Sequence, residues 1–302
     1  MEKIKKTLLL GSSGQTGSNL KKKLKSISKQ VKCLSKNELD LEKLNSIKKI
    51  LDKIKPNLII NAAAYTKVDE AENNKRKCFK INVLSTKELA NWSYKNDCFL
   101  LHYSTVYIFD GKKIKPWKEE DRPNPINYYG KSKLEAEKKI ILSKCNYLIL
   151  RLNWIYNEKG ENFPKKIIKK IKKKNEIFLV NNQIGTPNDA EFISNITVKI
   201  LKKIFVNKIN PKILNISARG KTNYFIFAKK ILENFKVELK KKKLIPINSN
   251  KYRKIYSEKN VERPLNSLLN IKKLEKFLNL KMPGWESIFE KKINKIIKKY
   301  SK

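Results

Sequence analysis

The sequence predicts an α/β protein with a doubly wound, Rossmann-type parallel sheet and a smaller, discontinuous substrate-binding domain. Three observations support this fold class. An apolar run and a glycine-rich turn open the chain, short apolar runs then alternate with amphipathic helical stretches to about residue 151, and the alternation fades afterwards. We expect the Rossmann domain to comprise residues 1–153 and about 186–206, and the substrate-binding domain about 154–185 and 207–302.

The first predicted unit is a strand over residues 7–10, a turn, and a helix that runs to about residue 28. The turn has the spacing Gly-x-x-Gly-x-x-Gly, in place of the commoner Gly-x-Gly-x-x-Gly. Glycines let the backbone turn sharply and approach a pyrophosphate, whose charge the helix N-terminus meets. A plain strand-to-helix turn is the alternative. We expect a dinucleotide cofactor to bind at Gly11, Ser13, Gly14, Gln15, Thr16 and Gly17.

The second predicted strand, residues 31–34, ends where an acidic residue would bind the ribose of NAD. Ser35 and Lys36 stand there instead, and a lysine can meet the 2′-phosphate of NADP. The sequence therefore favours NADPH and still allows NADH. Residues 38–41 lead to a helix over about 42–54, and the predicted cofactor contacts in this region are Ser35, Lys36, Asp40 and Leu41.

The third predicted strand, residues 57–61, is followed by three alanines. Small side chains at the carboxyl end of a parallel strand let a flat cofactor lie against the backbone. A helix over about 75–95 and a fourth strand over 98–104 come next. The predicted cofactor contacts here are Ala62, Ala63, Ala64, Tyr65 and Asn82.

A Ser-Thr pair, 104–105, ends the fourth strand, and a hydroxyl at this position could polarise a substrate carbonyl. Two prolines and the candidate N-cap Asn127 precede a helix that carries Tyr129 and Lys133 on one face, one turn apart. A cation there would lower the pKa of the Tyr129 phenol and could hold a cofactor ribose, which makes Tyr129 a candidate proton donor near neutral pH. Because lysine is so frequent here, such a pair also arises by chance. The prediction depends on the glycine turn and the Ser-Thr strand end.

A strand over residues 147–151 follows, and the sequence then becomes irregular. We assign substrate binding to this region and to the last third of the chain, including Arg263 and Trp285.

The formal net charge is +42, and all but six of the 70 basic residues are lysines. These lysines are scattered over every segment, which indicates compositional bias rather than a nucleic-acid-binding patch. Arginine, the better partner for phosphates and bases, is scarce. We expect no specific nucleic-acid partner, and we interpret the lysine runs at 165–174 and 237–243 as solvated helix or loop surface.

The four cysteines lie far apart without a Cys-x-x-Cys pair, so the sequence predicts neither a metal site nor a disulfide framework. No apolar run is long enough to span a membrane, and no signal peptide opens the chain. We expect a cytoplasmic protein without membrane insertion. The sole histidine, His102, lies within an apolar run and is interpreted as a strand residue rather than a catalyst.

Several segments together resemble the extended short-chain dehydrogenase/reductases and, more narrowly, the dTDP-4-dehydrorhamnose reductase family. The resemblance spans nearly the whole chain. The segments that carry it are residues 11–17, 61–69, 104–105, 129–133, 151–154, 182–187, 190–192 and 263–267.

This resemblance implies NAD(P)H-dependent reduction of the 4-keto group of dTDP-4-dehydro-L-rhamnose (dTDP-4-dehydro-6-deoxy-L-mannose) to dTDP-L-rhamnose, for surface polysaccharide synthesis. It implies catalytic roles for Thr105, Tyr129 and Lys133, of which Tyr129 and Lys133 would also contact the cofactor. It also allows a homodimer and a bound Mg²⁺ ion, although no metal ligands can be assigned from this sequence. The implied substrate contacts are Val68, Thr105, Val106 and Trp154.

Two positions depart from the family pattern: Val106 and Asn182 stand where aspartate is usual. These departures leave the exact substrate open more than the chemistry. The alternatives are another 4-keto sugar-nucleotide reductase or epimerase, or a non-catalytic regulatory subunit of the same fold, like the methionine adenosyltransferase partner. A dehydratase is disfavoured because no acidic pair follows Thr105.

Overall fold

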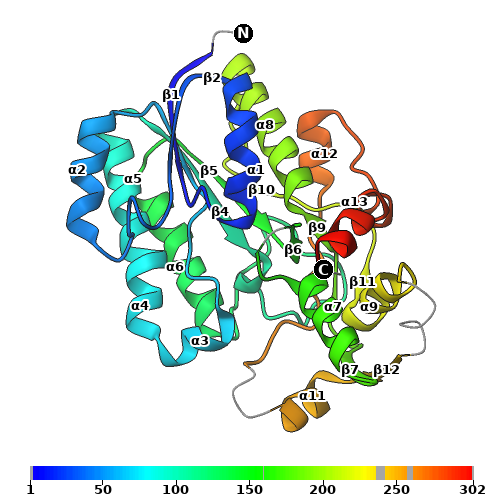
Figure 1. Cartoon of the computed structure of the whole chain (residues 1–302). Coiled ribbons are helices and arrows are strands. Elements are labelled where there is room, and N and C mark those ends of the chain that lie inside the picture. The colour runs from blue at the N-terminus through cyan, green and yellow to red at the C-terminus, as the bar shows by residue number, and fades with distance from the viewer. Residues whose placement is uncertain (1–2, 159, 236–241, 257–260, 301–302) are drawn as a thin grey trace.

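The computed structural model describes residues 3–158, 160–235, 242–256 and 261–300, and its centre is a six-stranded parallel sheet (Figure 1). The strands, in sheet order, are β10 (Ile213–Asn215), β5 (Tyr147–Leu152), β4 (Phe99–Thr105), β3 (Leu58–Asn61), β1 (Ile4–Leu10) and β2 (Ser28–Leu34). The chain continues from β1 to β2 on one side and from β3 to β4 on the other, so the carboxyl ends of the neighbouring strands β1 and β3 are the expected ligand edge.

Helices cover both faces of the sheet, because the strands bury apolar side chains on both sides (Figure 1). On one face pack α1 (Gln15–Lys23), α8 (Ala190–Asn207) and α12 (Lys272–Leu278). On the other pack α2 (Leu44–Ile54), α5 (Ser85–Lys95) and α6 (Tyr128–Leu142). The doubly wound Rossmann-type sheet predicted from the sequence is therefore confirmed.

The remaining elements of the first half complete this frame. A 3₁₀ turn, Leu24–Ser26, follows α1, and a second one, Val106–Ile108, follows β4. The helical stretch predicted over about 75–95 is present as α4 (Lys75–Phe79), a π-helical turn (Lys80–Leu84) and α5, and the short helix α3 (Val68–Asn73) precedes it.

A second group of elements lies below the sheet in Figure 1 and has its own apolar cluster, in which Trp285 is 1% exposed. Trp285 is thus a core residue of this part. The group contains α7 (Phe163–Lys173), α9 (Tyr224–Leu232), α11 (Ser249–Tyr256) and α13 (Trp285–Tyr300). Its strand pairs are β7 (Glu176–Val180) with β12 (Lys243–Ile247), β8 (Ile184–Gly185) with β11 (Thr222–Asn223), and β6 (Ile155–Tyr156) with β9 (Asn188–Asp189).

Two sequence expectations differ from the structure. Residues from 207 onward were assigned to the substrate-binding domain, but β10 pairs with β5 and is a strand of the main sheet. The region after residue 153 was expected to be irregular, with the run at 165–174 as solvated helix or loop surface, but α7 buries Ile167, Ile168 and Ile171 in the core between its lysines. The abundant lysines hide this helical pattern. Most of the second lysine run lies outside the described residues.

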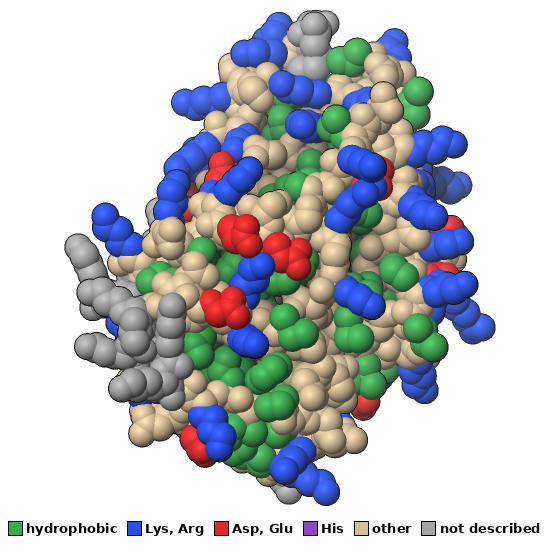
Figure 2. All heavy atoms as spheres, turned by 90° about the vertical axis from the view of Figure 1, so that its right-hand side faces the viewer, with side chains coloured by type: hydrophobic (Ala, Val, Ile, Leu, Met, Phe, Trp, Pro, Cys, Tyr) green, Lys and Arg blue, Asp and Glu red, His purple; other side chains and the backbone are tan. Residues whose placement is uncertain are grey.

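Lysine and arginine side chains are scattered over the face in Figure 2, with acidic side chains among them, and do not gather in one patch. Within the described part of the chain, no helix is both long and apolar enough to cross a membrane.

Candidate active site

The glycine turn after β1 packs directly against the end of β3. Gly11 has a φ of +73°, and a Cβ atom there would lie 2.8 Å from the carbonyl carbon of Ala62. A Cβ atom at Gly17 would lie 2.1 Å from the carbonyl oxygen of Gly11. The turn is therefore tightly closed at the N-terminus of α1, with no room for a side chain at Gly11 or Gly17, and this geometry fits the pyrophosphate of a dinucleotide.

Two predicted cofactor residues of the turn accept hydrogen bonds from distant elements. Asn157 donates a hydrogen bond of 3.1 Å from Nδ2 to the carbonyl oxygen of Gln15, and Ser194 donates one of 3.3 Å to the carbonyl oxygen of Thr16. The turn is thus held from α8 and from the loop after β6. The other two predicted residues, Ser13 and Gly14, are exposed at its tip.

At the end of β2, Ser35 donates hydrogen bonds from its backbone N and its Oγ to Oε2 of Glu38, at 2.8 and 2.9 Å. These bonds lower the pKa of Glu38 and hold a carboxylate beside the predicted ribose position, which the sequence analysis did not anticipate. Lys36 is exposed and Asp40 is half-buried. Leu41 is only 5% exposed and belongs to the apolar core, so its side chain is not placed for cofactor contact.

The segment after β3, from Ala62 to Tyr65, is half-buried and held from α6. The side chain of Asn82 accepts a hydrogen bond from the backbone N of Tyr65 at 2.7 Å and donates to Oγ of Ser132 at 2.9 Å. Asn82 is 1% exposed, so it positions the predicted cofactor segment against α6 rather than lining the site.

Helix α6 begins where the sequence predicts, because Oδ1 of Asn127 accepts a hydrogen bond from the backbone N of Gly130 at 2.8 Å. A Cβ atom at Gly130 would lie 2.1 Å from the carbonyl oxygen of Tyr107. The missing side chain therefore lets α6 approach the turn after β4. This close approach brings Tyr129 beside Thr105.

The side chains of Thr105 and Tyr129, predicted as catalytic residues, lie within interaction distance of one another. Oγ1 of Thr105 also accepts a hydrogen bond of 3.2 Å from the backbone N of Tyr107, which orients the hydroxyl. Burial raises the pKa of Tyr129, and Thr105 acts in the opposite direction. The pair can share one oxygen atom of a substrate, with Tyr129 as the proton donor.

Lys133 lies one turn further along α6 and is 2% exposed. Its Nζ contacts two groups of β4: the carbonyl oxygen of Tyr103 and Nε2 of His102, each at 2.7 Å. From the sequence, Lys133 was expected to lower the pKa of Tyr129, but the hydrogen bonds of Nζ go to β4, and burial raises the pKa of Tyr129. The same burial lowers the pKa of Lys133 to about 8.

Trp154, a predicted substrate contact, stacks on Tyr224 with ring centroids 4.0 Å apart and planes at 13°. The φ of Trp154 is +38°, and a Cβ atom at Gly185 would lie 2.4 Å from its ring, so both the backbone and the glycine accommodate the indole. Tyr224 is a site residue that the sequence analysis missed. A flat aromatic surface of this kind can hold a sugar or a base.

A series of aromatic contacts connects this stack to the predicted proton donor. The side chain of Tyr224 lies close to that of Tyr107, whose ring lies edge-on to Tyr129 with centroids 5.9 Å apart. Arg263 also lies close to Tyr107, and its Nη2 donates to Asp69 at 2.7 Å. Arg263, in the region predicted to bind the substrate, therefore places a cation near Tyr107 and Tyr129.

The two remaining predicted substrate residues differ in exposure. Val68 is half-buried at the start of α3. Val106 is fully buried in an apolar cluster with Ile108 and Phe109, so the structure does not place its side chain in the site. An aspartate at position 106 would bury a carboxylate in that cluster, which explains why valine fits here.

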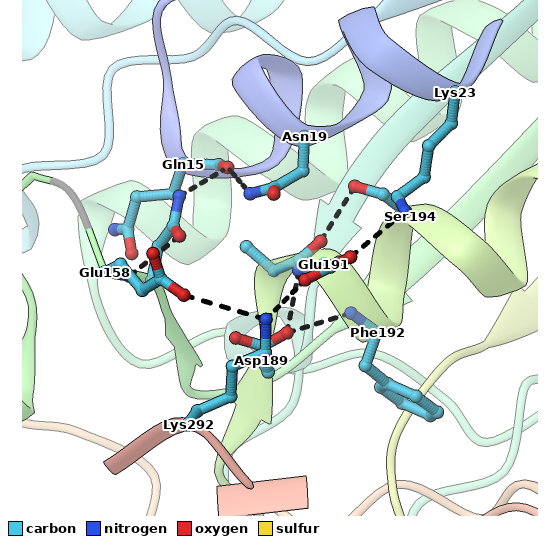
Figure 3. A network of polar contacts seen from close by, with 11 residues as sticks. Gln15, Asn19, Lys23, Glu158, Asp189, Glu191, Phe192, Ser194 and Lys292 are labelled. Carbon is cyan, nitrogen blue, oxygen red and sulfur yellow. Dashed lines mark hydrogen bonds and ion pairs between the residues drawn. The ribbon is translucent and has the colours of Figure 1, made fainter. Parts of the chain in front are cut away.

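The described residues do not fit a magnesium site. They contain no group of three or more His, Cys, Asp or Glu side chains placed to hold a metal ion. Carboxylates of Glu158 and Glu191 do approach one another, but the ammonium of Lys292 pairs with both of them (Figure 3). Lys23 adds a second cation, 3.2 Å from Glu191, while Asp189 caps α8.

Comparison with known proteins agrees with this arrangement. The family described as the RmlD substrate binding domain matches residues 5–300. The dTDP-4-dehydrorhamnose reductase of Aggregatibacter actinomycetemcomitans is 31% identical over 290 residues, which are 92% of this chain and 95% of that protein. The enzyme of the same name from Escherichia coli (strain K12) is 29% identical over 296 residues, which are 96% and 97% of the two chains.

Solved structures give the same result. The dTDP-4-dehydrorhamnose reductase of Bacillus anthracis in complex with NADP has a TM-score of 0.84 and 29% identity, over 96% of this chain and 98% of that one. The Clostridium acetobutylicum protein has a TM-score of 0.85 and 27% identity over the same shares. Since sequence and structure match over nearly the full length, the chain belongs to the dTDP-4-dehydrorhamnose reductase family of NAD(P)H-dependent oxidoreductases, within the extended short-chain dehydrogenase/reductases.

Proposed function

We propose that this chain catalyses the NADPH-dependent reduction of the 4-keto group of dTDP-4-dehydro-L-rhamnose to dTDP-L-rhamnose, for surface polysaccharide synthesis. The observation that carries the proposal is the adjacent pair of Thr105 and Tyr129 at the same edge of the sheet as the glycine turn of β1 and β3. Membership of the reductase family supports the substrate. NADPH rather than NADH is proposed because Lys36 is exposed at the end of β2 and because a related structure holds NADP.

In this reaction a bound NADPH supplies the hydride that reaches C4 of the sugar, and the residues of the chain handle the proton. Tyr129 donates the phenolic proton to the C4 oxygen, and Thr105 donates a hydrogen bond to the same oxygen. The C4 carbonyl group thus gains a hydride on its carbon and a proton on its oxygen, which gives the product hydroxyl. Tyr129 then recovers its proton from water.

The other proposed roles follow from position. Lys133 holds the cofactor ribose from α6, and residues 11–17 and 62–65 bind the remainder of the cofactor. Trp154 and Tyr224 hold the sugar nucleotide from the opposite side of Tyr107. The domain limits given above, with β10 moved to the Rossmann domain, the cytoplasmic location and a homodimer are proposed on the same family membership.

The test is to follow NADPH and NADH oxidation by absorbance with the 4-keto sugar nucleotide generated in place by its upstream enzymes. Tyr129→Phe should lower turnover by about 10²-fold or more, since it removes the proton donor. Tyr128→Phe is the matched control on the same helix and should retain turnover. Absence of turnover with either cofactor, despite cofactor binding, would sink the proposal in favour of another 4-keto sugar nucleotide or a regulatory role.

A further inference from the structure

Few of the described groups around Lys133 accept a hydrogen bond from its buried ammonium. The charged and titratable groups around it are Tyr129 and Glu137 on α6, His102 and Tyr103 on β4, and Cys78 on α4. Tyr103 contributes only its carbonyl oxygen, at 2.7 Å from Nζ. The remaining close contact is Nε2 of His102, also at 2.7 Å.

The nearby carboxylate does not serve Lys133 directly. Glu137 accepts two hydrogen bonds from Arg151, at 3.1 Å from Nε and 2.7 Å from Nη2, and both side chains of this ion pair are almost fully buried. A buried ammonium that lacks a carboxylate partner needs neutral acceptors to remain charged. His102 is the side chain that supplies one.

We propose that His102 is a positioning residue that keeps Lys133 charged and fixed in the site, by accepting a hydrogen bond from its ammonium through Nε2. His102 is 1% exposed, and burial together with Lys133 lowers the pKa of His102 far below its ordinary value, so the ring is neutral and has one free lone pair. The proposal rests on the role of Lys133 in holding the cofactor, as proposed above.

This arrangement also defines the part played by Asn61. If Nε2 accepts, the ring proton is on Nδ1, which lies 3.2 Å from the side-chain amide of Asn61. The amide must then turn its oxygen toward Nδ1, because the two ends of an amide exchange by a half-turn. That turn releases the long 3.2 Å bond from the backbone N of Ala63 to Asn61. Asn61 thus lies between His102 and the predicted cofactor segment, and its half-turn exchanges the bond from Ala63 for one from His102.

The experiment measures NADPH and NADH affinity by cofactor fluorescence across pH 8 for the wild type and five variants. Binding should weaken as pH rises through the pKa of Lys133, about 8, because the ammonium is lost. His102→Leu should move this weakening about one pH unit lower, which makes binding about fivefold weaker at pH 8. The shift should be the same for NADH, which lacks the titrating 2′-phosphate.

Three of the variants separate the possible causes. His102→Gln restores an acceptor and should return the pH dependence close to the wild type. Leu100→Ala is the matched control on the same face of β4, and it should lower stability without moving the pH dependence. Asn61→Ser leaves His102 in place and should shift the dependence in the same direction as His102→Leu, by less.

The fifth variant, Lys133→Met, distinguishes the two proposals. If it leaves cofactor affinity and its pH dependence unchanged, the role of Lys133 in the proposed function is wrong. If Lys133→Met abolishes the pH dependence but His102→Leu and Asn61→Ser do not move it, the role of His102 alone is wrong. A shift to higher pH in His102→Leu would also overturn it, because it would mean that Nε2 donates to a neutral amine.

Discussion

The backbone of Gly130 lies so close to Tyr107 that a Cβ atom on the glycine would be 2.1 Å from the Tyr107 carbonyl oxygen. This contact sets the distance between α6, which carries Tyr129, and the turn after β4, which follows Thr105. The distance between Tyr129, the proposed proton donor, and Thr105 therefore depends on the glycine at position 130.

Gly130→Ala should separate these elements, because the clashing atom is backbone and cannot move away alone. We expect turnover to fall by about 10²-fold, since a displacement of about 1 Å has this effect on a positioned catalytic group. Steady-state kinetics together with thermal unfolding measure the result. Gly284→Ala is the matched control, because its Cβ atom would lie 3.8 Å from Oε2 of Glu286, which is an ordinary contact distance. Equal activity in both variants would contradict the close approach of α6.

Glu137 and Arg151 form an ion pair whose side chains are 2% and 4% exposed. Glu137→Gln leaves the guanidinium buried without its counter-charge, so we expect a loss of about 3–5 kcal/mol in the free energy of unfolding. Urea unfolding measures it. The exposed pair of Glu135 and Lys138 on the same helix provides the control, and Glu135→Gln should cost less than about 0.5 kcal/mol. Similar losses in the two variants would show that burial of the pair does not decide its contribution.

The stacked rings of Trp154 and Tyr224 should bind the sugar nucleotide and not the cofactor. Tyr224→Leu removes the stack, and the KM for the sugar nucleotide should rise up to about tenfold, as expected for an aromatic pair of about 0.5–1.5 kcal/mol. Tyr224→Phe keeps the ring and loses only the hydroxyl near Tyr107, so its KM should rise less. An equal loss of NADPH affinity would assign this stack to the cofactor instead.

The exposed Lys36 should favour NADPH over NADH through its charge. Lys36→Ala should lower the NADPH-to-NADH ratio of kcat/KM about fivefold, since a unit charge about 4 Å from a phosphate oxygen in water contributes about 1 kcal/mol. Lys87→Ala, an exposed lysine on α5, is the control and should leave the ratio unchanged. Glu38→Gln should raise the ratio, because it removes a negative charge bonded to Ser35. A ratio unaffected by Lys36→Ala would place the 2′-phosphate elsewhere.

Local sequence determined the strands of the sheet, the glycine turn, the start of α6 and the shared helix face of two proposed catalytic residues. The strands at 7–10, 31–34, 57–61, 98–104 and 147–151, the glycine turn and the N-cap Asn127 all occur where the sequence predicts them. Tyr129 and Lys133 share one helix face because helical periodicity alone requires it. These features depend on residues a few positions apart, and such interactions can be recognised along the chain.

The tertiary structure decided the features that depend on burial and on distant contacts. Val106 is buried in a core cluster, β10 joins the main sheet, and Tyr224 stacks on Trp154, although none of these has a local sequence pattern. His102 was correctly placed in a strand, but only the packing of α6 on β4 brought its ring to Lys133. Contacts between residues far apart in sequence, and the exclusion of water that accompanies them, exist only once the elements are packed together.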